Sequence, residues 1–484
     1  MSWRSSRSTT ESPLEGYLRR QPLETPRLGS PPPADLEVVV VIPCREEPEP
    51  LATLESLRAG IPPGAGAEVI VVVNGAADDP PEAVAIHQRT LADLDRWIAA
   101  RSEDHLRFHR LDCTRLPPRE AGVGLARKLG MDAAAARFLA VGNDQGIILC
   151  LDADCRVAPN YLAAVVDHFR ANPQSPGATV PFAHPLATLT PGPLRRGMIA
   201  YELYLRYHFR GLLWAGHPHA VLAMGSAMAV RAGVYAAQGG MNRRQGGEDF
   251  YFLQKIVPLG GFTQVAATLV EPAARLSARA PFGTGRALGR WLEAGGGDFL
   301  VYDCRLYAHL HAFFTRMEAL PEEVWGTKAG PTRESPPRLL EAGGTPDGEE
   351  ATDRPRPGGA DAGAPPLQAP LEPLLEEFLR TQGFDQAMAR IRRHTTSRAH
   401  GRQHFYRWFN GLLCLKYLHH GTARGFPKRP VVEMARTLLN WWEKETPTGK
   451  EQGSVAAETA EGGAAERLLE RYRGLDRGWK GSGK

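Results

Sequence analysis

The sequence predicts an α/β protein with a doubly wound, mainly parallel sheet flanked by helices, followed by a C-terminal helical region. Between residues 37 and 169, apolar runs of strand length alternate with segments whose apolar residues recur at helical spacing. Three of these runs end in polar or turn-forming residues, which is typical of parallel strands whose carboxyl ends share one edge of a sheet. From residue 374 to residue 442 only helical spacing remains.

The expected strands are runs rich in Val, Ile and Leu, as in a sheet that is buried on both faces. We place them at residues 37–42, 68–73, 106–111 and 147–151. The expected helices show apolar residues three or four apart, or are rich in alanine. We place them at residues 51–57, 91–98, 124–138 and 161–169. Because strand and helix alternate four times, the crossovers join parallel strands.

Composition divides the rest of the chain. Residues 1–34 are polar and proline-rich, so we expect them to be disordered, and a core domain should follow over residues 35–325. Residues 326–370, rich in Pro, Gly and acidic residues, are expected to form a disordered linker. A helical region over 371–445 and a tail over 446–484, expected to be mobile apart from a short helical stretch, complete the expected organisation.

Overall charge and cysteine usage exclude several classes of protein. The net charge of the 484 residues is +4, and no basic cluster is interleaved with aromatic residues, so we expect no nucleic-acid partner. The six cysteines are scattered without a CxxC pair, which favours neither a zinc site nor a disulfide framework and fits a cytosolic chain.

Two segments of the sequence bear on secretion and on membrane insertion. The N-terminal 34 residues lack the apolar core of a secretory signal. No residue between Arg210 and Arg231 is formally charged, and this span is long enough to cross a bilayer. It contains His217, Pro218 and His219 together with several glycines, so we expect a loop and a strand there.

The segment Asp152-Ala153-Asp154 directly follows the last expected strand. Residues two apart on an extended chain point the same way, so both carboxylates would meet at one point beyond the strand end. Two such carboxylates repel each other unless a cation or proton lies between them. A hard divalent ion, Mg²⁺ or Mn²⁺, that also holds a diphosphate would fit. The alternative is an acidic turn in which Asp154 caps the next helix, and this segment alone leaves both open.

The turn after the first strand lacks a glycine-rich phosphate loop. Residues 43–48, Pro-Cys-Arg-Glu-Glu-Pro, match neither GxGxxG nor GxxxxGK, which excludes dinucleotide oxidoreductases and P-loop enzymes. A nucleotide could instead bind across the strand ends. Pro43 and Glu46 would then contact the nucleoside, Asn74 the base, and Asp152 and Asp154 the ribose and the metal.

A second acidic pair, Glu248-Asp249, follows Gly246-Gly247. One explanation is structural, because acidic residues are favoured in the first turn of a helix. The functional explanation is that one carboxylate acts as a general base on an acceptor hydroxyl. A metal-held diphosphate leaving group and a carboxylate base are together sufficient to move a sugar from a nucleotide to an alcohol.

Four segments, in this order and spacing, carry a resemblance. They are Val-Ile-Pro-Cys-Arg-Glu-Glu (41–47), Val-Ile-Val-Val-Val-Asn-Gly (69–75), Cys-Leu-Asp-Ala-Asp-Cys (150–155) and Gly-Gly-Glu-Asp-Phe (246–250). Over about residues 36–300 the chain resembles a family 2 glycosyltransferase of the GT-A fold. The resemblance implies inverting transfer of a hexose-like sugar from a nucleoside-diphosphate sugar to a saccharide or lipid-linked acceptor, as in cell-envelope polysaccharide synthesis. It also implies a nucleotide-binding half over 35–175 and an acceptor half over 176–325.

The resemblance also implies roles for single residues. Asp152-Ala153-Asp154 would be the family's DxD motif, with Asp154 the direct metal ligand and Asp152 nearer the ribose. Asp249 would be the base and Glu248 its neighbour near the acceptor, although these two could be exchanged. Arg127 and Lys128 sit where similar enzymes bring polar residues to the nucleotide, and a solvated helix face is the alternative for both.

Several further residues are weaker candidates for ligand binding. One of four histidines could join the metal site, although structural or acceptor-contacting roles are commoner; these are His184, His208, His217 and His219. Arg279 and Arg286 could clamp the diphosphate on closure of their loop, or belong to a plain surface loop. A stripe formed by Phe405, Trp408, Phe409 and Leu412 is assigned to helix packing.

The sequence departs from the family pattern in two places. Asn74 occupies the position where the family often has an aspartate, so the sequence does not predict which nucleobase the donor carries. Residues 287–291, Ala-Leu-Gly-Arg-Trp, lack the glutamine of the Q-x-x-R-W motif of processive synthases. Because the sequence pattern also lacks membrane helices, we expect a single-addition enzyme in the cytoplasm. Peripheral contact with the inner face of the membrane is compatible with this expectation.

Two other functions were kept as alternatives. A sugar nucleotidyltransferase shares the use of metal and nucleotide, but that class usually has a glycine-rich basic loop after the first strand, which Cys44-Arg45-Glu46-Glu47 lacks. A catalytically inactive carbohydrate-binding or scaffold protein would need no base, so the Glu248-Asp249 pair disfavours it.

Overall fold

The computed structural model describes residues 11–21, 26, 28–101, 106–277, 283–325, 372–445 and 461–481. By the contacts within the chain it divides into two compact units. The catalytic unit runs from the first described residue to Glu202, and then contains Val221–Gly296 and the chain from Arg473 onward. The helical unit contains Leu203–Ala220 and Gly297–Tyr472.

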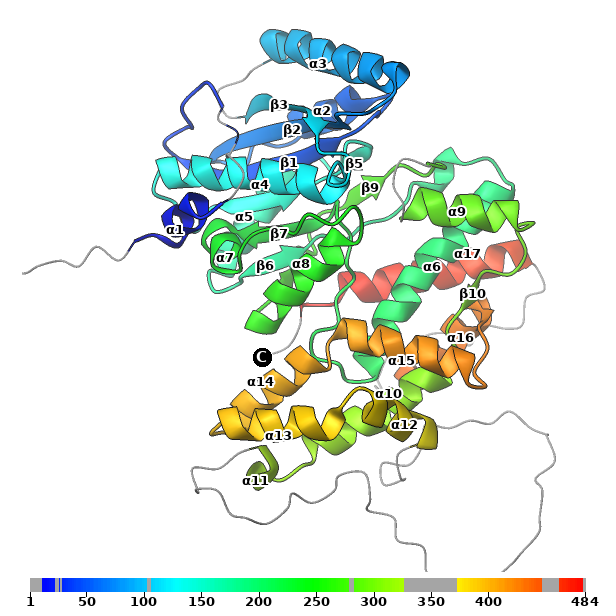
Figure 1. Ribbon diagram of the computed structural model, residues 1–484. Helices are drawn as coiled ribbons and strands as arrows, with labels where there is room; N and C mark the ends of the chain where they lie inside the picture. Colours follow the sequence, from blue (N-terminus) through cyan, green and yellow to red (C-terminus); the bar gives the residue numbers. More distant parts are fainter. Residues whose placement is uncertain are drawn as a thin grey trace, which may run out of the picture. The chain divides into compact units, whose positions relative to one another are not determined.

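A seven-stranded sheet forms the centre of the catalytic unit (Figure 1), in the order β3-β2-β1-β4-β7-β6-β8. Its first four members in this order are parallel: β3 (Leu106–Leu116), β2 (Gly66–Ala76), β1 (Leu36–Cys44) and β4 (Ile147–Cys150). The antiparallel β7 (Met228–Arg231) pairs with β4, and β6 (Gly177–Thr179) and β8 (Thr263–Gln264) follow. The predicted doubly wound, mainly parallel sheet is therefore confirmed.

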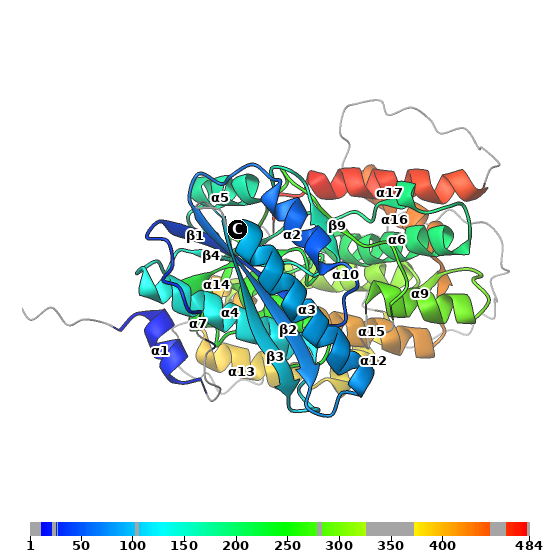
Figure 2. The ribbon, with the colours of Figure 1, turned by 90° about the horizontal axis from the view of Figure 1, so that it is seen from above.

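The expected crossover helices are present between the parallel strands and after β4. They are α2 (Pro50–Arg58), α3 (Pro81–Arg101), α4 (Val123–Ala140) and α5 (Tyr161–Ala171). Helix α4 lies close to the sheet at Gly130, where an added Cβ would come within 2.4 Å of Val41 Cγ1. In the view from above, α4 lies on one side of the strands, whereas α3 and α5 lie on the other (Figure 2).

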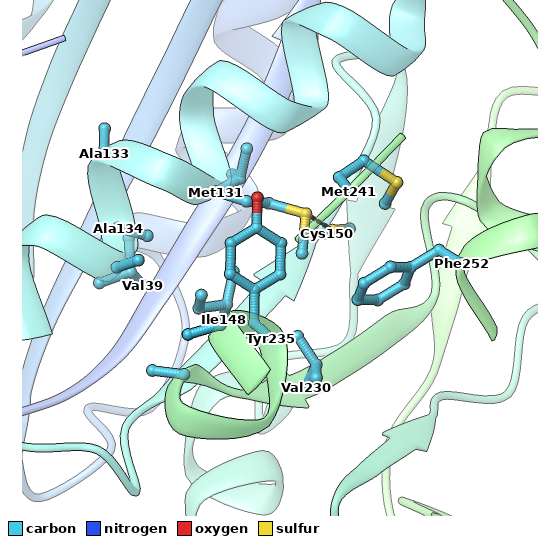
Figure 3. Close-up of a cluster of buried hydrophobic side chains, with 14 of the residues drawn as sticks. Val39, Met131, Ala133, Ala134, Ile148, Cys150, Val230, Tyr235, Met241 and Phe252 are labelled. Atoms are coloured by element: carbon cyan, nitrogen blue, oxygen red, sulfur yellow. Dashed lines mark hydrogen bonds between the residues drawn. The ribbon is translucent and has the colours of Figure 1, made fainter. Parts of the chain in front are cut away.

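One face of the sheet carries a continuous apolar core (Figure 3). Val39, Ile148 and Val230 point from the strands toward Met131 of α4, Tyr235 of α7 (Ala232–Ala237) and Phe252 of α8 (Glu248–Ile256). Alternate residues such as Val38 and Val40 are equally buried but lie outside this cluster. Because side chains alternate along a strand, these residues face the opposite side, and both faces of the sheet are covered.

The N-terminal segment contains a helix that we did not expect. Helix α1 (Pro13–Arg19) begins after Ser12, whose hydroxyl caps it and bonds Asp144 at 2.9 Å. Leu14 and Tyr17 are fully buried in the core beside α4 and α7. The prediction of disorder is therefore wrong for this helix, because two apolar residues suffice to anchor it although the segment is polar overall. Residues 1–10 lie outside the described residues.

Residues 176–325 are less regular than the preceding part of the chain, as expected. They contain the short helical turns η1 (Leu186–Thr188) and η2 (Val257–Leu259), helix α9 (Thr284–Glu293), and β9 (Val270–Pro272), which pairs with β5 (Cys155–Val157). The uncharged span between Arg210 and Arg231 contains the end of α6 (Pro193–Trp214), a loop and β7. Among the described residues, no helix combines the length and apolarity needed to cross a membrane.

The helical unit begins earlier than we predicted. Helices α10 (Arg305–Glu318) and α11 (Glu322–Trp325) belong to it, so the expected domain boundary at residue 325 is displaced to about residue 297. It also contains α12 (Pro373–Thr381), α13 (Phe384–His394), α14 (Arg398–Trp408), α15 (Gly411–Ala423) and α16 (Val431–Glu445), together with parts of two helices that cross the unit boundary. A short pair of strands, β10 (Leu300–Val301) and β11 (Arg429–Pro430), completes the unit.

The predicted linker and part of the predicted tail, residues 326–371 and 446–460, lie outside the described residues. The predicted helical stretch within the tail is longer than expected: α17 (Glu461–Arg477) buries Leu468, Leu469 and Tyr472. Its apolar residues are few, but they fall on one face of the helix, and burial of that face outweighs the charged composition.

Candidate active site

Three parallel strand ends bring together the predicted nucleotide-binding residues. Pro43 lies near the end of β1 beside Val72 of β2, and Asn74 lies two residues further along β2. Asp152 follows the end of β4, which is paired with β1 on the other side. Pro43 and Asn74 are buried, whereas the Asp152 side chain is 38% exposed and that of Asp154 is 29% exposed. The carboxylates are thus the open part of this sheet edge.

The turn after β1 is held in a strained conformation. Glu46 has φ = +49°, the left-handed region that a residue with a side chain adopts at a cost of about 1 kcal/mol or more. Arg45 fixes the turn through bonds to Asp79 Oδ1 at 2.6 Å, the Ala121 carbonyl at 2.9 Å and Glu46 Oε1 at 3.1 Å. The predicted nucleoside contact Glu46 therefore sits on a rigid turn at the edge of the sheet.

Arg127 of α4 connects the two acidic motifs. Its guanidinium donates to Asp152 Oδ1 at 3.0 Å, to Glu248 Oε1 at 3.2 Å and to the Gly225 carbonyl at 2.9 Å. Burial alone would lower the pKa of Arg127, but Asp152 and Glu248 raise it above its ordinary value. Because Arg127 is only 1% exposed, a solvated helix face is excluded for this residue.

Glu248 and Asp249 open helix α8 but have different surroundings. Burial raises the pKa of Glu248, although the ion pair with Arg127 opposes the shift, and Asp249 adds to it. Burial likewise raises the pKa of Asp249, again opposed by Arg127. Asp249 Oδ1 accepts a bond from the Phe250 amide at 2.7 Å, and no described cation lies within salt-bridge distance of the carboxylate. Of the two, only Glu248 is therefore neutralised by a direct partner.

Close backbone contacts place this acidic pair beside α4. An added Cβ at Gly124 would come within 2.1 Å of the Arg244 carbonyl oxygen, and one at Gly225 within 2.7 Å of Arg127 Nη2. The same position at Gly225 lies 3.5 Å from Asp249 Oδ2. Glycine is therefore required at both positions for the loops to approach the helix and the arginine.

Comparison with known proteins identifies a family for part of the chain. Residues 39–232, which include Asp152, Asp154 and Arg127, match the model of glycosyl transferase family 2. The chain carries a family 2 glycosyltransferase domain. No curated protein sequence matches the chain significantly.

Solved structures of glycosyltransferases also match, at low identity. Residues 1–349 of TarS from S. aureus, in complex with UDP-GlcNAc, are 14% identical with a TM-score of 0.34, over 58% of this chain and 71% of that chain. GalNAc-T7 with UDP, GalNAc and Mn²⁺ is 16% identical with a TM-score of 0.33, over 59% and 52%. The mannosyltransferase PcManGT from Pyrobaculum calidifontis, in complex with GDP-Man and Mn²⁺, is 19% identical with a TM-score of 0.27, over 54% and 61%.

The glycosyltransferase domain offers two carboxylates to a metal. In the part of the chain that the structure describes, no group of three or more His, Cys, Asp or Glu side chains is placed to hold an ion. Asp152 and Asp154 still fit Mg²⁺ or Mn²⁺ by their chemistry, because both ions prefer oxygen ligands and accept the remaining ones from a diphosphate and water. Each carboxylate also has a cationic neighbour: Arg127 Nη2 lies 3.0 Å from Asp152 Oδ1, and Arg275 Nη2 lies 3.6 Å from Asp154 Oδ2.

Arg275, just after β9, is a residue that our sequence analysis missed. Its Nη2 lies 2.6 Å from Oε1 of the buried Glu47 and 3.6 Å from Asp154 Oδ2. Arg275 is more than 100 residues from either partner in the sequence, and no motif surrounds it. Only the pairing of β9 with β5, the strand that follows Asp154, brings it to the glycosyltransferase site.

Lys128 does not join the site of the glycosyltransferase as predicted. Its ammonium donates to Tyr17 Oη at 2.7 Å, Gln21 Oε1 at 2.9 Å and Asp132 Oδ2 at 2.9 Å, so all three N–H groups are used within a buried network at α1. Successive residues on a helix point about 100° apart, so Arg127 and Lys128 face different neighbours. The prediction of a nucleotide contact is therefore wrong for Lys128.

The four candidate histidines have structural partners. His184 Nδ1 lies 2.9 Å from Glu202 Oε2 in a fully buried pair. His208 contacts Tyr307 Oη, His217 contacts the Phe409 carbonyl, and the His219 amide donates to His217 Nδ1, all within the helical unit. Burial lowers the pKa of both His208 and His217 to about 4.

The two arginines considered as a diphosphate clamp are only partly described. Arg286 is exposed in the first turns of α9. Arg279 lies outside the described residues.

Proposed function

We propose that this enzyme transfers a sugar, with inversion at its anomeric carbon, from a nucleoside-diphosphate sugar to a hydroxyl of a saccharide or lipid-linked acceptor. The observation that supports this most directly is the different pairing of the three acidic residues around Arg127. Asp152 and Glu248 bind the arginine, whereas Asp249 has no direct cationic partner among the described residues and a raised pKa. Asp249 is thus the carboxylate suited to accept a proton.

In the proposed reaction, Asp249 receives the proton of the acceptor hydroxyl as the acceptor oxygen bonds to the anomeric carbon. The bond from that carbon to the diphosphate oxygen breaks at the same time, and the nucleoside diphosphate leaves with the electron pair. Attack on the face opposite the leaving group inverts the configuration. When bound, Mg²⁺ or Mn²⁺ would supply positive charge to the leaving diphosphate, and Asp154 with Asp152 would hold the ion.

The residues at the strand ends are assigned to the donor. Pro43 and Glu46 would contact the nucleoside, Asn74 the base, and Asp152 the ribose. Arg127 would act as a positioning residue, because it fixes Asp152 and Glu248 through bonds of 3.0 and 3.2 Å. A lipid-linked acceptor, as in cell-envelope polysaccharide synthesis, would require peripheral contact between this chain and a membrane.

A binding screen separates metal-dependent donor binding from chemistry. UDP- and GDP-sugars are added with Mn²⁺, thermal stabilisation reports binding, and sugar release or transfer reports turnover. We expect Asp154→Ala to lose the Mn²⁺-dependent stabilisation, because it removes the proposed direct metal ligand, and Asp249→Asn to keep stabilisation but lose transfer. If both variants transferred sugar at the parental rate, the assignment of both residues would be wrong.

A further inference from the structure

The hairpin of α13 and α14 in the helical unit encloses a groove of about 610 Å³. In Figure 1 these two helices lie side by side. Its lining includes Arg390 and His394 from α13, and His404, Arg407 and Trp408 from α14. Arg390 and His394 are four residues apart, and the α14 residues are three and four apart, so each set lies on one face of its helix. The groove is therefore formed by one basic face from each helix.

The charge of this hairpin is strongly one-sided. Between Phe384 and Asn410 the sequence contains six arginines and three histidines against a single acidic residue, Asp385. Several other described arginines of the helical unit form ion pairs; Arg402, for example, bonds Glu318 at 2.6 Å, and Arg305 bonds Asp303 at 2.6 Å. In contrast, the guanidinium groups of Arg390 and Arg407 bind no described residue, and both side chains are exposed. Two uncompensated cations thus border one groove.

The floor of the groove is rigid and apolar. Ile391 is buried beneath it. Trp408 is only partly buried, and its ring packs against Phe384 and Phe405, with centroids 5.9 and 6.2 Å away. Phe405 and Phe409, from the aromatic stripe seen in the sequence, are fully buried as predicted for helix packing, but Trp408 also reaches the groove. An aromatic side chain held in this way offers a preorganised surface to a ring.

We propose that this groove binds a phosphate-bearing saccharide. The two guanidinium groups would hold the phosphate through charge-assisted hydrogen bonds, for which arginine is the best-suited side chain. Trp408 would cover the apolar face of the sugar ring, and His394 and His404 would bond its hydroxyl groups. This site lies wholly within the helical unit and does not depend on the reaction proposed for the catalytic unit.

Other anionic ligands fit the groove less well. A nucleic acid would need a longer basic surface with several aromatic platforms, whereas Trp408 is the one tryptophan that lines this groove. A membrane surface would be bound by charge without a requirement for an aromatic ring. The presence of two arginines without an ion-pair partner among the described residues, beside one partly exposed tryptophan, therefore favours a small phosphorylated sugar as the ligand.

Isothermal titration of the full chain with glucose 1-phosphate, glucose and inorganic phosphate tests this inference. EDTA is included so that metal-dependent donor binding does not contribute. We expect glucose 1-phosphate to bind the parent more tightly than either of the other two probes. Replacing both arginines, Arg390→Gln with Arg407→Gln, should weaken binding by about a hundredfold, because two charge-assisted contacts are lost. Trp408→Ala should abolish the preference for glucose 1-phosphate over inorganic phosphate.

Arg393→Gln is the matched control, because Arg393 is an exposed arginine of α13 outside the groove lining. It should bind like the parent, and thermal unfolding confirms that every variant is folded. Absence of glucose 1-phosphate binding, or equal weakening in Arg393→Gln, would overturn the proposal. Vesicles containing phosphatidic acid and a single-stranded RNA serve as competing probes. If the vesicles or the RNA bound more tightly than glucose 1-phosphate, and the double variant lost that binding, the groove would be assigned to a membrane or to RNA instead.

Discussion

At the scale of single residues, Arg127 determines how the acidic groups of the site differ from one another. A buried arginine that binds Asp152 and Glu248 satisfies both carboxylates at once and leaves Asp249 to be tuned by burial. The identity of the acidic residues was predicted from the sequence, since strand-end position and glycine spacing are local features. Their division of roles was predicted only from the resemblance, which left Glu248 and Asp249 exchangeable, because it depends on which carboxylate a side chain 121 positions away can reach.

The pKa of Asp249 gives the enzyme a characteristic pH dependence. Burial raises this pKa above the ordinary aspartate value of 3.8, so the carboxylate that we propose as the base becomes protonated at a higher pH than an exposed aspartate would. We expect kcat/KM to fall as the pH is lowered through this raised value. Arg127 opposes the shift, so Arg127→Gln should move the acidic limb to still higher pH, as a series of pH–rate profiles would show.

Arg115→Gln is the control for this prediction. Arg115 is exposed and forms no ion pair with a described residue. Its replacement should leave the acidic limb where it is in the parent enzyme. If the acidic limb of the Arg127→Gln profile stayed at the same pH or moved to lower pH, another group would control the fall in kcat/KM.

At the scale of elements, the fit of α4 against the loop before α8 positions the acidic pair. Gly124→Ala would place a methyl group 2.1 Å from the Arg244 carbonyl, so the loop must move and carry Glu248 and Asp249 with it. Because misplacement by about 1 Å can cost about a hundredfold in rate, we expect kcat to fall by about that factor. Steady-state kinetics with saturating donor measure this effect.

Gly289→Ala in α9 is the matched control, because no atom lies within 4 Å of its added Cβ. It should leave kcat unchanged and raise the free energy of unfolding by up to about 1 kcal/mol, as expected for replacing glycine in a helix. A parental kcat in Gly124→Ala would contradict the positioning role of this contact.

The elements themselves differed in how well the sequence predicted them. Continuous apolar runs predicted the parallel strands β1, β2 and β4, whereas the strand at residues 106–111 had a weaker signal, because charged residues and a histidine interrupt its apolar residues. Helix α1 was not, because only Leu14 and Tyr17 mark it, and their burial depends on the distant Asp132 and Tyr235, which both bond or contact Tyr17. Arg275 escaped prediction for the same physical reason, since its place is set by strand pairing between β5 and β9.

At the scale of the whole molecule, the chain returns to the catalytic unit through α17. Tyr472 donates to the Ala435 carbonyl within the helical unit, whereas the next residue, Arg473, binds the buried Glu202 within the catalytic unit. Arg473 also donates to the His184 carbonyl at 3.1 Å. The boundary between the two units therefore falls inside α17. Composition alone could not indicate this boundary, because the residue content of α17 is that of a charged tail.

Arg473→Met should destabilise the protein. It removes the ion pair that Arg473 forms with the buried Glu202, and breaking a buried ion pair in this way costs about 3–5 kcal/mol in the free energy of unfolding. Urea denaturation at neutral pH measures the change. Arg477→Met, an exposed position on the same helix, should alter stability by less than about 0.5 kcal/mol. Equal stabilities of the two variants would show that the Glu202 contact contributes little.

The central claim is that Asp249, and not Glu248, removes the acceptor proton. Single-turnover transfer by Asp249→Asn and by Glu248→Gln, each with bound donor and saturating acceptor, tests it most directly. We predict that Asp249→Asn loses a factor of about 10²–10⁴ in rate, the usual contribution of a general base. Glu248→Gln, which keeps a hydrogen-bond acceptor for Arg127, should lose much less. The reverse order, or equal losses, would contradict the assignment.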